Sequence, residues 1–199
     1  MKSVILASSS SYRKKLLQDV LGVKNIIAIP PTFSEENFKQ EHLEMQNDPK
    51  QLSIVLSKMK GESIAKSYFD SIVISGDQVC VAANQIWDKP LNRENAVKTL
   101  LKLQGTTHQL ITSVSLFYQN QMFEHQDITQ LTMAPLNLAQ IERYLNFAHP
   151  WDCAGSYKIE HGGIGLFSKI ETSDHTSIEG IPLLFVRKIL CDHLGVKLW

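Results

Sequence analysis

The sequence lacks the features of a secreted, membrane-bound or polyanion-binding protein. Its 199 residues include only three cysteines, far apart and without a CxxC spacing, which argues against a disulfide framework and a thiolate zinc site. No apolar run approaches the ~18 residues of a membrane span, and the apolar start, residues 4–7, is too short for a signal peptide. The 20 basic residues balance the 20 acidic ones, so no excess charge could hold nucleic acid non-specifically. We therefore expect a cytoplasmic protein whose partners include neither a membrane nor a nucleic-acid polymer.

Glycine-rich phosphate loops are also missing. No GxxxxGK[ST] pattern occurs, so the chain does not suggest a P-loop NTPase. Internal repeats, low-complexity tracts and obvious linkers are absent as well. We expect one domain over residues 1–199, large enough to bury roughly 70% of its unfolded surface.

Strand-like and helix-like segments alternate along the chain. Apolar runs and alternation predict strands at 4–7, 25–29, 71–75, 107–118 and 121–133, a hairpin around 83–85, and a Gly-rich strand region at 162–170. Helical spacing predicts helices after residue 11 and at 49–68, 92–103, 138–147 and 183–194. The polar residues 30–48 predict a long surface loop. This interleaving indicates an α/β protein with a mixed sheet.

Four serines, residues 8–11, stand where the first strand ends and the first helix begins, and Arg13 follows them. Hydroxyls, free backbone N–H groups and a cation at a helix start can bind an anion. Serine is also a preferred helix cap. Capping followed by a solvated basic face is therefore an equal alternative for these residues by themselves.

Asp77 follows the apolar run 72–74, so we expect it at the C-terminal end of a buried strand, where ligand clefts of α/β sheets lie. A carboxylate there can hold a divalent metal or accept a proton from an attacking water. A turn aspartate after Gly76 is the commoner alternative. Lys60 and Lys89 could supply cations for a phosphoanhydride substrate, although lone lysines are usually solvated surface.

His149, Asp152 and Cys153 are close in sequence and invite a metal or thiol interpretation. Their spacing matches neither a zinc motif nor a nucleophile elbow. Tight packing at a sheet edge explains this stretch equally well.

Taken in order, these segments resemble the Maf family of nucleoside triphosphate pyrophosphatases across nearly the whole chain. Residues 6–17, LASSSSYRKKLL, are similar to the family's LASxSPxR-xxLL signature, with Ser11 in place of the usual proline. The other matches are Lys60-Gly61 to KA, 76–79 to (A/S)DxV, 88–91 to GKPL, 105–108 to GxxH, 154–158 to AGxY and 179–183 to xGLPL. Each match is weak alone, and their shared order is specific.

The resemblance implies a mixed sheet with flanking helices that form two lobes around a substrate cleft. It implies hydrolysis of a nucleoside triphosphate between the α- and β-phosphates, with a divalent cation (Mg, Mn or Co) as cofactor. Asp77 occupies the position of the catalytic proton acceptor. The phosphate-binding positions are Ser8, Ser10, Arg13, Lys60 and Lys89.

Two departures from the family pattern affect the site. The family's Asp-Glu pair appears here as Ser34-Glu35, which leaves Glu35, together with Asp77, as the expected metal ligands. Near the C-terminus, 172–174 lacks the usual glycine, and no role is carried over to it.

Three positions bear on base preference, and here they are Tyr12, Gln78 and Glu160. They resemble the branch of the family that hydrolyses 7-methyl-GTP, a house-cleaning activity against modified nucleotides. Methylation at N7 makes guanine cationic, so an aromatic face and a carboxylate would both favour it. The alternatives are a dTTP/UTP pyrophosphatase of the same family and a non-catalytic nucleotide-binding regulator of cell division. Whether the chain forms a homodimer stays open.

Overall fold

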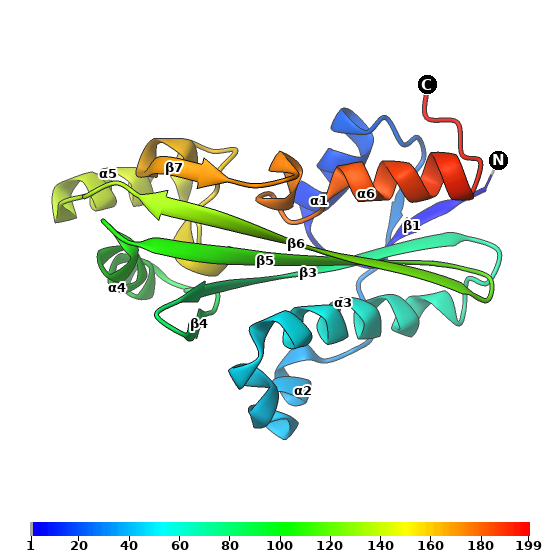
Figure 1. Cartoon of the computed structure of the whole chain (residues 1–199), viewed down its shortest axis with the longest axis horizontal. Coiled ribbons are helices and arrows are strands. Elements are labelled where there is room, and N and C mark those ends of the chain that lie inside the picture. The colour runs from blue at the N-terminus through cyan, green and yellow to red at the C-terminus, as the bar shows by residue number, and fades with distance from the viewer. Residues whose placement is uncertain (1) are drawn as a thin grey trace. The chain divides into compact units, whose positions relative to one another are not determined.

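The computed structural model describes residues 2–199, which form an α/β fold around a seven-stranded mixed sheet (Figure 1). The predicted fold class is confirmed. The strands are β1 (Val4–Leu6), β2 (Ile27–Ala28), β3 (Ile72–Ala82), β4 (Gln85–Trp87), β5 (Thr107–Tyr118), β6 (Gln121–Met133) and β7 (Phe167–Glu171). They follow the order β2-β1-β3-β5-β6-β7, with β4 paired to β3. The α-helices are α1 (Ser11–Lys15), α2 (Glu35–Glu41), α3 (Pro49–Ala65), α4 (Arg93–Leu103), α5 (Leu138–Ala148) and α6 (Leu183–Lys188).

The chain divides into two compact units. Unit 1 consists of Met1–Asp77, Thr112–Asp127 and Asp174–Trp199, and unit 2 of Gln78–Ile111 and Ile128–Ser173. The strands β3, β5 and β6 each begin in one unit and end in the other. The expectation of a single domain over residues 1–199 stays a prediction. No helix within residues 2–199 is long and apolar enough to cross a membrane.

Unit 1 has helices on both faces of its strands. β1 pairs in parallel with β2 and β3, so that Ile5 lies beside Ile27 and Val73. Figure 1 shows α3 on one face and α6 with α1 on the other. Side chains alternate between these faces: Leu6 and Ile74 join the larger apolar core with α6, and Ile5 and Val73 pack on the side of α3. Burial on both faces explains why these strands are continuous apolar runs.

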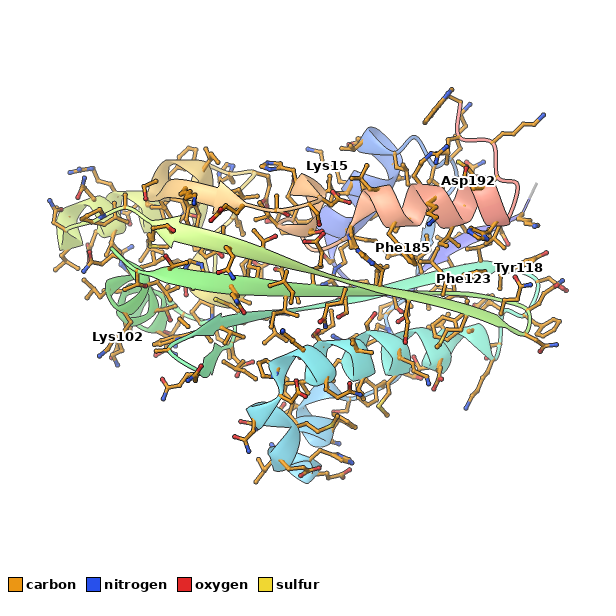
Figure 2. All side chains as sticks on the ribbon, in the orientation of Figure 1. Lys15, Lys102, Tyr118, Phe123, Phe185 and Asp192 are labelled. Carbon is orange, nitrogen blue, oxygen red and sulfur yellow. The ribbon has the colours of Figure 1, made fainter. Side chains whose placement is uncertain are left out.

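Aromatic side chains hold the C-terminal helix against the sheet. Phe185 of α6 stacks on His125 of β6 with ring centroids 4.8 Å apart. Phe123 of β6 packs against His193 at 5.6 Å, in the π-helical turn Ile189–His193 that continues α6. Figure 2 shows Phe123 and Phe185 between the strand and the helix. The predicted helix over 183–194 is thus present as one α-helical and one π-helical segment.

Unit 2 contains the predicted hairpin and two capped helices. Ala83 and Asn84 connect β3 to β4 with φ of 49° and 59°, the positive values that a tight two-residue hairpin turn needs. Asn92 caps α4 by accepting a hydrogen bond from the backbone of Asn95 at 2.9 Å. Gly105, at φ 66°, follows the end of that helix as expected. α4 packs against α5.

Several predicted elements were wrong in extent or type. The expected loop 30–48 contains α2 and the 3₁₀ turn Leu43–Asn47, because Ser34 caps α2 and the helix buries Phe38. The expected strand 25–29 shortens to β2. The region 162–170 begins with the 3₁₀ turn Gly163–Leu166 before β7.

The strand expected at 71–75 continues to Ala82. Ser75 and Gly76, which interrupt the apolar residues of this segment, are typical of the end of a strand. Ser75 instead donates hydrogen bonds to the backbone carbonyls of Ser57 and Ser115, at 2.7 and 3.3 Å, and is fully buried. A satisfied polar residue can remain inside a strand.

Candidate active site

Lys60 lies at the centre of a charged group in unit 1. Its Nζ atom is 2.5 Å from Asp77 Oδ1 and 2.6 Å from Glu35 Oε2. The three side chains come from α3, β3 and the first position of α2. The side chains of Lys60 and Asp77 are only 12% and 6% exposed, whereas that of Glu35 is 36% exposed. The fold therefore brings together three residues that the family resemblance had assigned to one site.

A second lysine also contacts Glu35. Lys39 Nζ is 3.0 Å from Glu35 Oε1, one helical turn along α2. Burial by itself would raise the pKa of Glu35, but the positive charges and hydrogen bonds of Lys60 and Lys39 outweigh it and lower that pKa to about 2. Lys39 was missed at the sequence level because this segment was expected to be a loop, which hides an i,i+4 pair.

The serine segment forms a turn that both caps α1 and contacts Arg13. Ser10 Oγ accepts a hydrogen bond from the Arg13 backbone at 3.4 Å, so its hydroxyl caps α1, and the phosphate-binding role assigned to Ser8 and Ser10 stays a prediction. Ser8 is buried. Its Oγ accepts from the Ser10 backbone at 3.1 Å and from Arg13 Nη1 at 3.4 Å.

Arg13 joins the same charged group. Its Nε donates to the carbonyl oxygen of Gly180 at 2.8 Å. Burial lowers the pKa of the guanidinium below its usual value, against the opposing effect of the negative charges of Asp77 and Glu35. Arg13, Glu35, Lys60 and Asp77 will be called the charge cluster. It contains two cations and two carboxylates, so its formal charges cancel.

Asp77 lies inside β3 and not after its end, which corrects the expectation from the sequence. The strand runs on for five further residues, to Ala82. Gly76 precedes Asp77, and a Cβ added there would lie 3.2 Å from the Ser113 carbonyl oxygen and 3.6 Å from Arg13 Nε. The tighter of these two contacts is with the backbone of β5, so the small residue lets β3 and β5 approach closely beside Asp77.

The remaining predicted residues are distributed over both units. Tyr12 is half-buried in α1 of unit 1, and Gln78 is half-buried in the part of β3 that belongs to unit 2. Lys89, after β4, and Glu160 are exposed residues of unit 2. Within residues 2–199, Lys89 has no hydrogen bond or ion pair that would explain it as a structural residue. The assigned roles of these residues stay predictions.

Unit 2 has a buried pair that sequence reasoning did not resolve. His108 Nε2 is 2.9 Å from the Tyr157 hydroxyl, and burial lowers the pKa of His108 to about 4. Both residues belong to family segments, His108 to GxxH and Tyr157 to AGxY, but the sequence does not show that these two side chains contact each other.

The thiol and metal alternatives around residues 149–153 gain no support. Burial, reinforced by the negative charge of Asp152, raises the pKa of Cys153 to about 12, so the thiol stays protonated and is a poor nucleophile. Among residues 2–199, no three His, Cys, Asp or Glu side chains converge on a point that could hold a metal ion.

Comparison with known proteins agrees with the sequence motifs. A family model described as "Maf-like protein" matches residues 3–193. A 7-methyl-GTP pyrophosphatase of Bdellovibrio bacteriovorus is 40% identical over 189 residues, covering 95% of this chain and 96% of that protein. A nucleoside triphosphate pyrophosphatase of Legionella pneumophila is 33% identical, covering 92% and 90%. Among solved structures, the Staphylococcus aureus Ham1 protein matches with a TM-score of 0.45 and 13% identity, over 81% of this chain and 90% of that one.

Proposed function

This chain belongs to the Maf-like protein family, and we propose that it is a nucleotide pyrophosphatase that hydrolyses 7-methyl-GTP to 7-methyl-GMP and diphosphate. The observation that most directly supports hydrolysis of a phosphoanhydride is the contact of one lysine, Lys60, with two carboxylates, Asp77 at 2.5 Å and Glu35 at 2.6 Å. Cations held in a part-buried site stabilise the charge that develops on a transferring phosphoryl group. The setting would be the cytoplasm, and the purpose the removal of modified nucleotides.

The reaction joins a water oxygen to the α-phosphorus and breaks the bond from that phosphorus to the oxygen bridging the α- and β-phosphates. Asp77 accepts the proton of the attacking water, and diphosphate leaves with the bridging oxygen. Arg13, Lys60 and Lys89 bind phosphate oxygens and offset their negative charge. Ser8 and the turn at Ser10 are assigned to the same phosphate site, and both also hydrogen-bond Arg13, each at 3.4 Å.

Glu35 and Asp77 are the residues that would hold a divalent cation. Their oxygens already converge on one positive charge, the Lys60 ammonium, and carboxylate oxygens are the ligands that Mg²⁺ and Mn²⁺ prefer. Magnesium is usually bound through one or two carboxylates, with substrate phosphates and water completing its shell, so two carboxylates suffice. When bound, the cation would polarise phosphate oxygens and help to deprotonate water.

Base specificity is assigned to Tyr12, Gln78 and Glu160. The support is their match to the 7-methyl-GTP branch of the family and the name of the Bdellovibrio relative. A carboxylate and an aromatic ring favour the cationic N7-methylated guanine over a neutral base. The pyrimidine alternative, dTTP and UTP, lacks both the charge and the donor pattern of guanine.

The test of the catalytic assignment is Asp77→Asn, with diphosphate release measured in Mg²⁺ or Mn²⁺. We expect turnover on the best substrate to fall below about a tenth of wild type, because loss of a general base typically costs 10²–10⁴-fold. Asp19→Asn, at an exposed position in the π-helical turn Leu16–Val20 that follows α1, is the matched control and should keep full activity. Retention of more than about a tenth of the turnover by Asp77→Asn would refute its role.

Substrate choice is tested on the wild-type protein by comparing kcat/KM for 7-methyl-GTP, GTP, UTP and dTTP. We expect 7-methyl-GTP to be the best substrate. A preference for UTP or dTTP would move the chain to the pyrimidine alternative and leave the reaction class unchanged. Nucleotide binding without any diphosphate release would instead indicate the non-catalytic regulator.

A further inference from the structure

The loop before α6, residues 174–182, holds the carbonyl oxygen that contacts Arg13. The Gly180 carbonyl oxygen accepts the hydrogen bond from Arg13 Nε at 2.8 Å. The backbone of Gly180 has a φ of 106°, a conformation that residues other than glycine rarely adopt. A Cβ at Gly180 would lie 3.2 Å from that nitrogen. The loop therefore fits closely around the guanidinium.

Asp174 and Thr176 connect this loop to the first turn of α6. Asp174 is buried. Its Oδ1 accepts from the backbone and hydroxyl of Thr176, at 3.0 and 2.6 Å, and its Oδ2 accepts from the Leu184 backbone at 2.7 Å. Thr176 Oγ1 in turn accepts from the Leu183 backbone at 2.9 Å. Asp174 and Thr176 thus accept hydrogen bonds from the first backbone N–H groups of α6. The N-cap residue of this helix, Pro182, has no side-chain acceptor that could do so.

The other side of the loop is tied to the sheet. Thr112, fully buried in β5, donates from Oγ1 to the Ser177 carbonyl oxygen at 2.9 Å, and the Gly180 backbone donates to the same oxygen at 3.0 Å. Because α6 is also stacked on β6 through Phe185 (Figure 2), the Gly180 carbonyl is held between two fixed elements.

A guanidinium is planar, so fixing Nε fixes the direction of its terminal nitrogens. Nε is already bound by Gly180, and Nη1 is 3.4 Å from Ser8 Oγ. Arg13 must then meet an anion with its terminal nitrogens, in an orientation that the loop selects. Neither Asp174 nor Thr176 has to contact the anion for this.

We propose that Asp174 and Thr176 are positioning residues, which orient Arg13 for the phosphates of the nucleotide through the Gly180 carbonyl. This inference rests on the proposed function, in which Arg13 binds substrate phosphates. It gives a role to a segment in which the family motif is incomplete.

The experiment compares Thr176→Val with Thr176→Ser. Valine keeps the shape of threonine but removes the hydroxyl that links Leu183 to Asp174, whereas serine keeps that hydroxyl. We expect Thr176→Val to lower kcat/KM by about 10-fold or more, since a small misplacement of a substrate-binding group can cost up to ~10²-fold. Thr176→Ser should stay within about twofold of wild type, because the rescued hydroxyl restores both bonds.

A double-mutant cycle with Arg13→Gln separates positioning from general destabilisation. In the Arg13→Gln background, Thr176→Val should cause little further loss, because no guanidinium remains to be oriented. The melting temperature should instead drop by the same amount in both backgrounds. If Thr176→Val lowers kcat/KM equally with and without Arg13, or lowers it in neither, the proposal is overturned.

The same cycle is measured on the Kd of inorganic tripolyphosphate, which needs no turnover. Non-additive Kd values without any diphosphate release would refute the proposed function and keep the positioning role. Diphosphate release with additive effects on both kcat/KM and Kd would keep the function and refute the positioning role.

Discussion

Gly61 lets α3 approach the sheet closely, so Gly61→Ala is expected to destabilise the protein even though alanine is the better helix former. The residue lies in the interior of α3, directly after Lys60. An added Cβ would lie 2.5 Å from Ser75 Oγ and overlap the ring of Phe117, whose Cδ2 would be 2.9 Å away. Both neighbours are buried. Ser75 is further restrained by its hydrogen bond to the Ser57 carbonyl at 2.7 Å.

The size of the effect follows from two opposing terms. Alanine gains about 1 kcal/mol over glycine in a helix interior, and overpacking a well-filled core costs roughly 1–3 kcal/mol. Because two restrained groups must move, the upper part of that range applies, and we expect a net loss of about 1–2 kcal/mol. In a protein of this size that lowers Tm by roughly 2–8 °C. Displacing α3 also moves Lys60 away from Asp77, so diphosphate release should fall as well.

Thermal unfolding and diphosphate release are measured on Gly61→Ala and two comparison variants. Gly165→Ala is the matched control, because an added Cβ there meets nothing within 4 Å. Its free energy of unfolding should change by no more than about 0.5 kcal/mol. Adding Phe117→Leu to Gly61→Ala removes ring atoms from the clash and should recover part of the activity. A Gly61→Ala protein that melts at or above the wild-type temperature would refute this account of the α3 contact.

Two further predictions concern unit 2. Lys89→Ala should lower kcat/KM for nucleoside triphosphates by about 10-fold or more through the loss of a phosphate contact, while Tm stays unchanged because the side chain is exposed; an unchanged kcat/KM would remove Lys89 from the site. The pKa of buried His108 lies at about 4, below its usual 6.5. As the pH falls, His108 therefore takes up a proton in the unfolded chain before it does so in the folded protein. The contribution of neutral His108 to the free energy of unfolding is complete above pH ~6.5 and falls by on the order of 3 kcal/mol as the pH drops toward 4. In urea unfolding at several pH values, His108→Gln should lose less stability than wild type over this interval, and parallel curves would contradict the assignment.

Much of the local structure was accessible from the sequence because its signals are local. The cap Asn92, Gly105 after α4 and the turn before β4 each act within a few residues of themselves. The family motifs occur in a fixed order, and the resemblance assigned Asp77, Lys60 and Glu35 to one site before their mutual contacts were known.

Other features depend on groups with no signature in a one-dimensional pattern. The partner of Arg13 is a backbone carbonyl, that of Gly180, which any residue type could offer. Lys39 became visible only when residues 35–41 proved to be helical. Ser75 suggested the end of a strand, although tertiary hydrogen bonds keep it inside β3.

The sequence by itself determined the alternation of strands and helices, because hydrophobic periodicity and capping are local, and the family, because its motifs are ordered. Only the tertiary structure decided that Lys60 contacts both Asp77 and Glu35, residues 17 and 25 positions away. It also decided that Asp77 lies inside a strand and that a loop more than 160 residues distant from Arg13 supplies its carbonyl partner. The physical reason is that these contacts arise from how α2, α3 and the loop before α6 pack on the sheet, and packing joins residues whose separation along the chain carries no periodic signal.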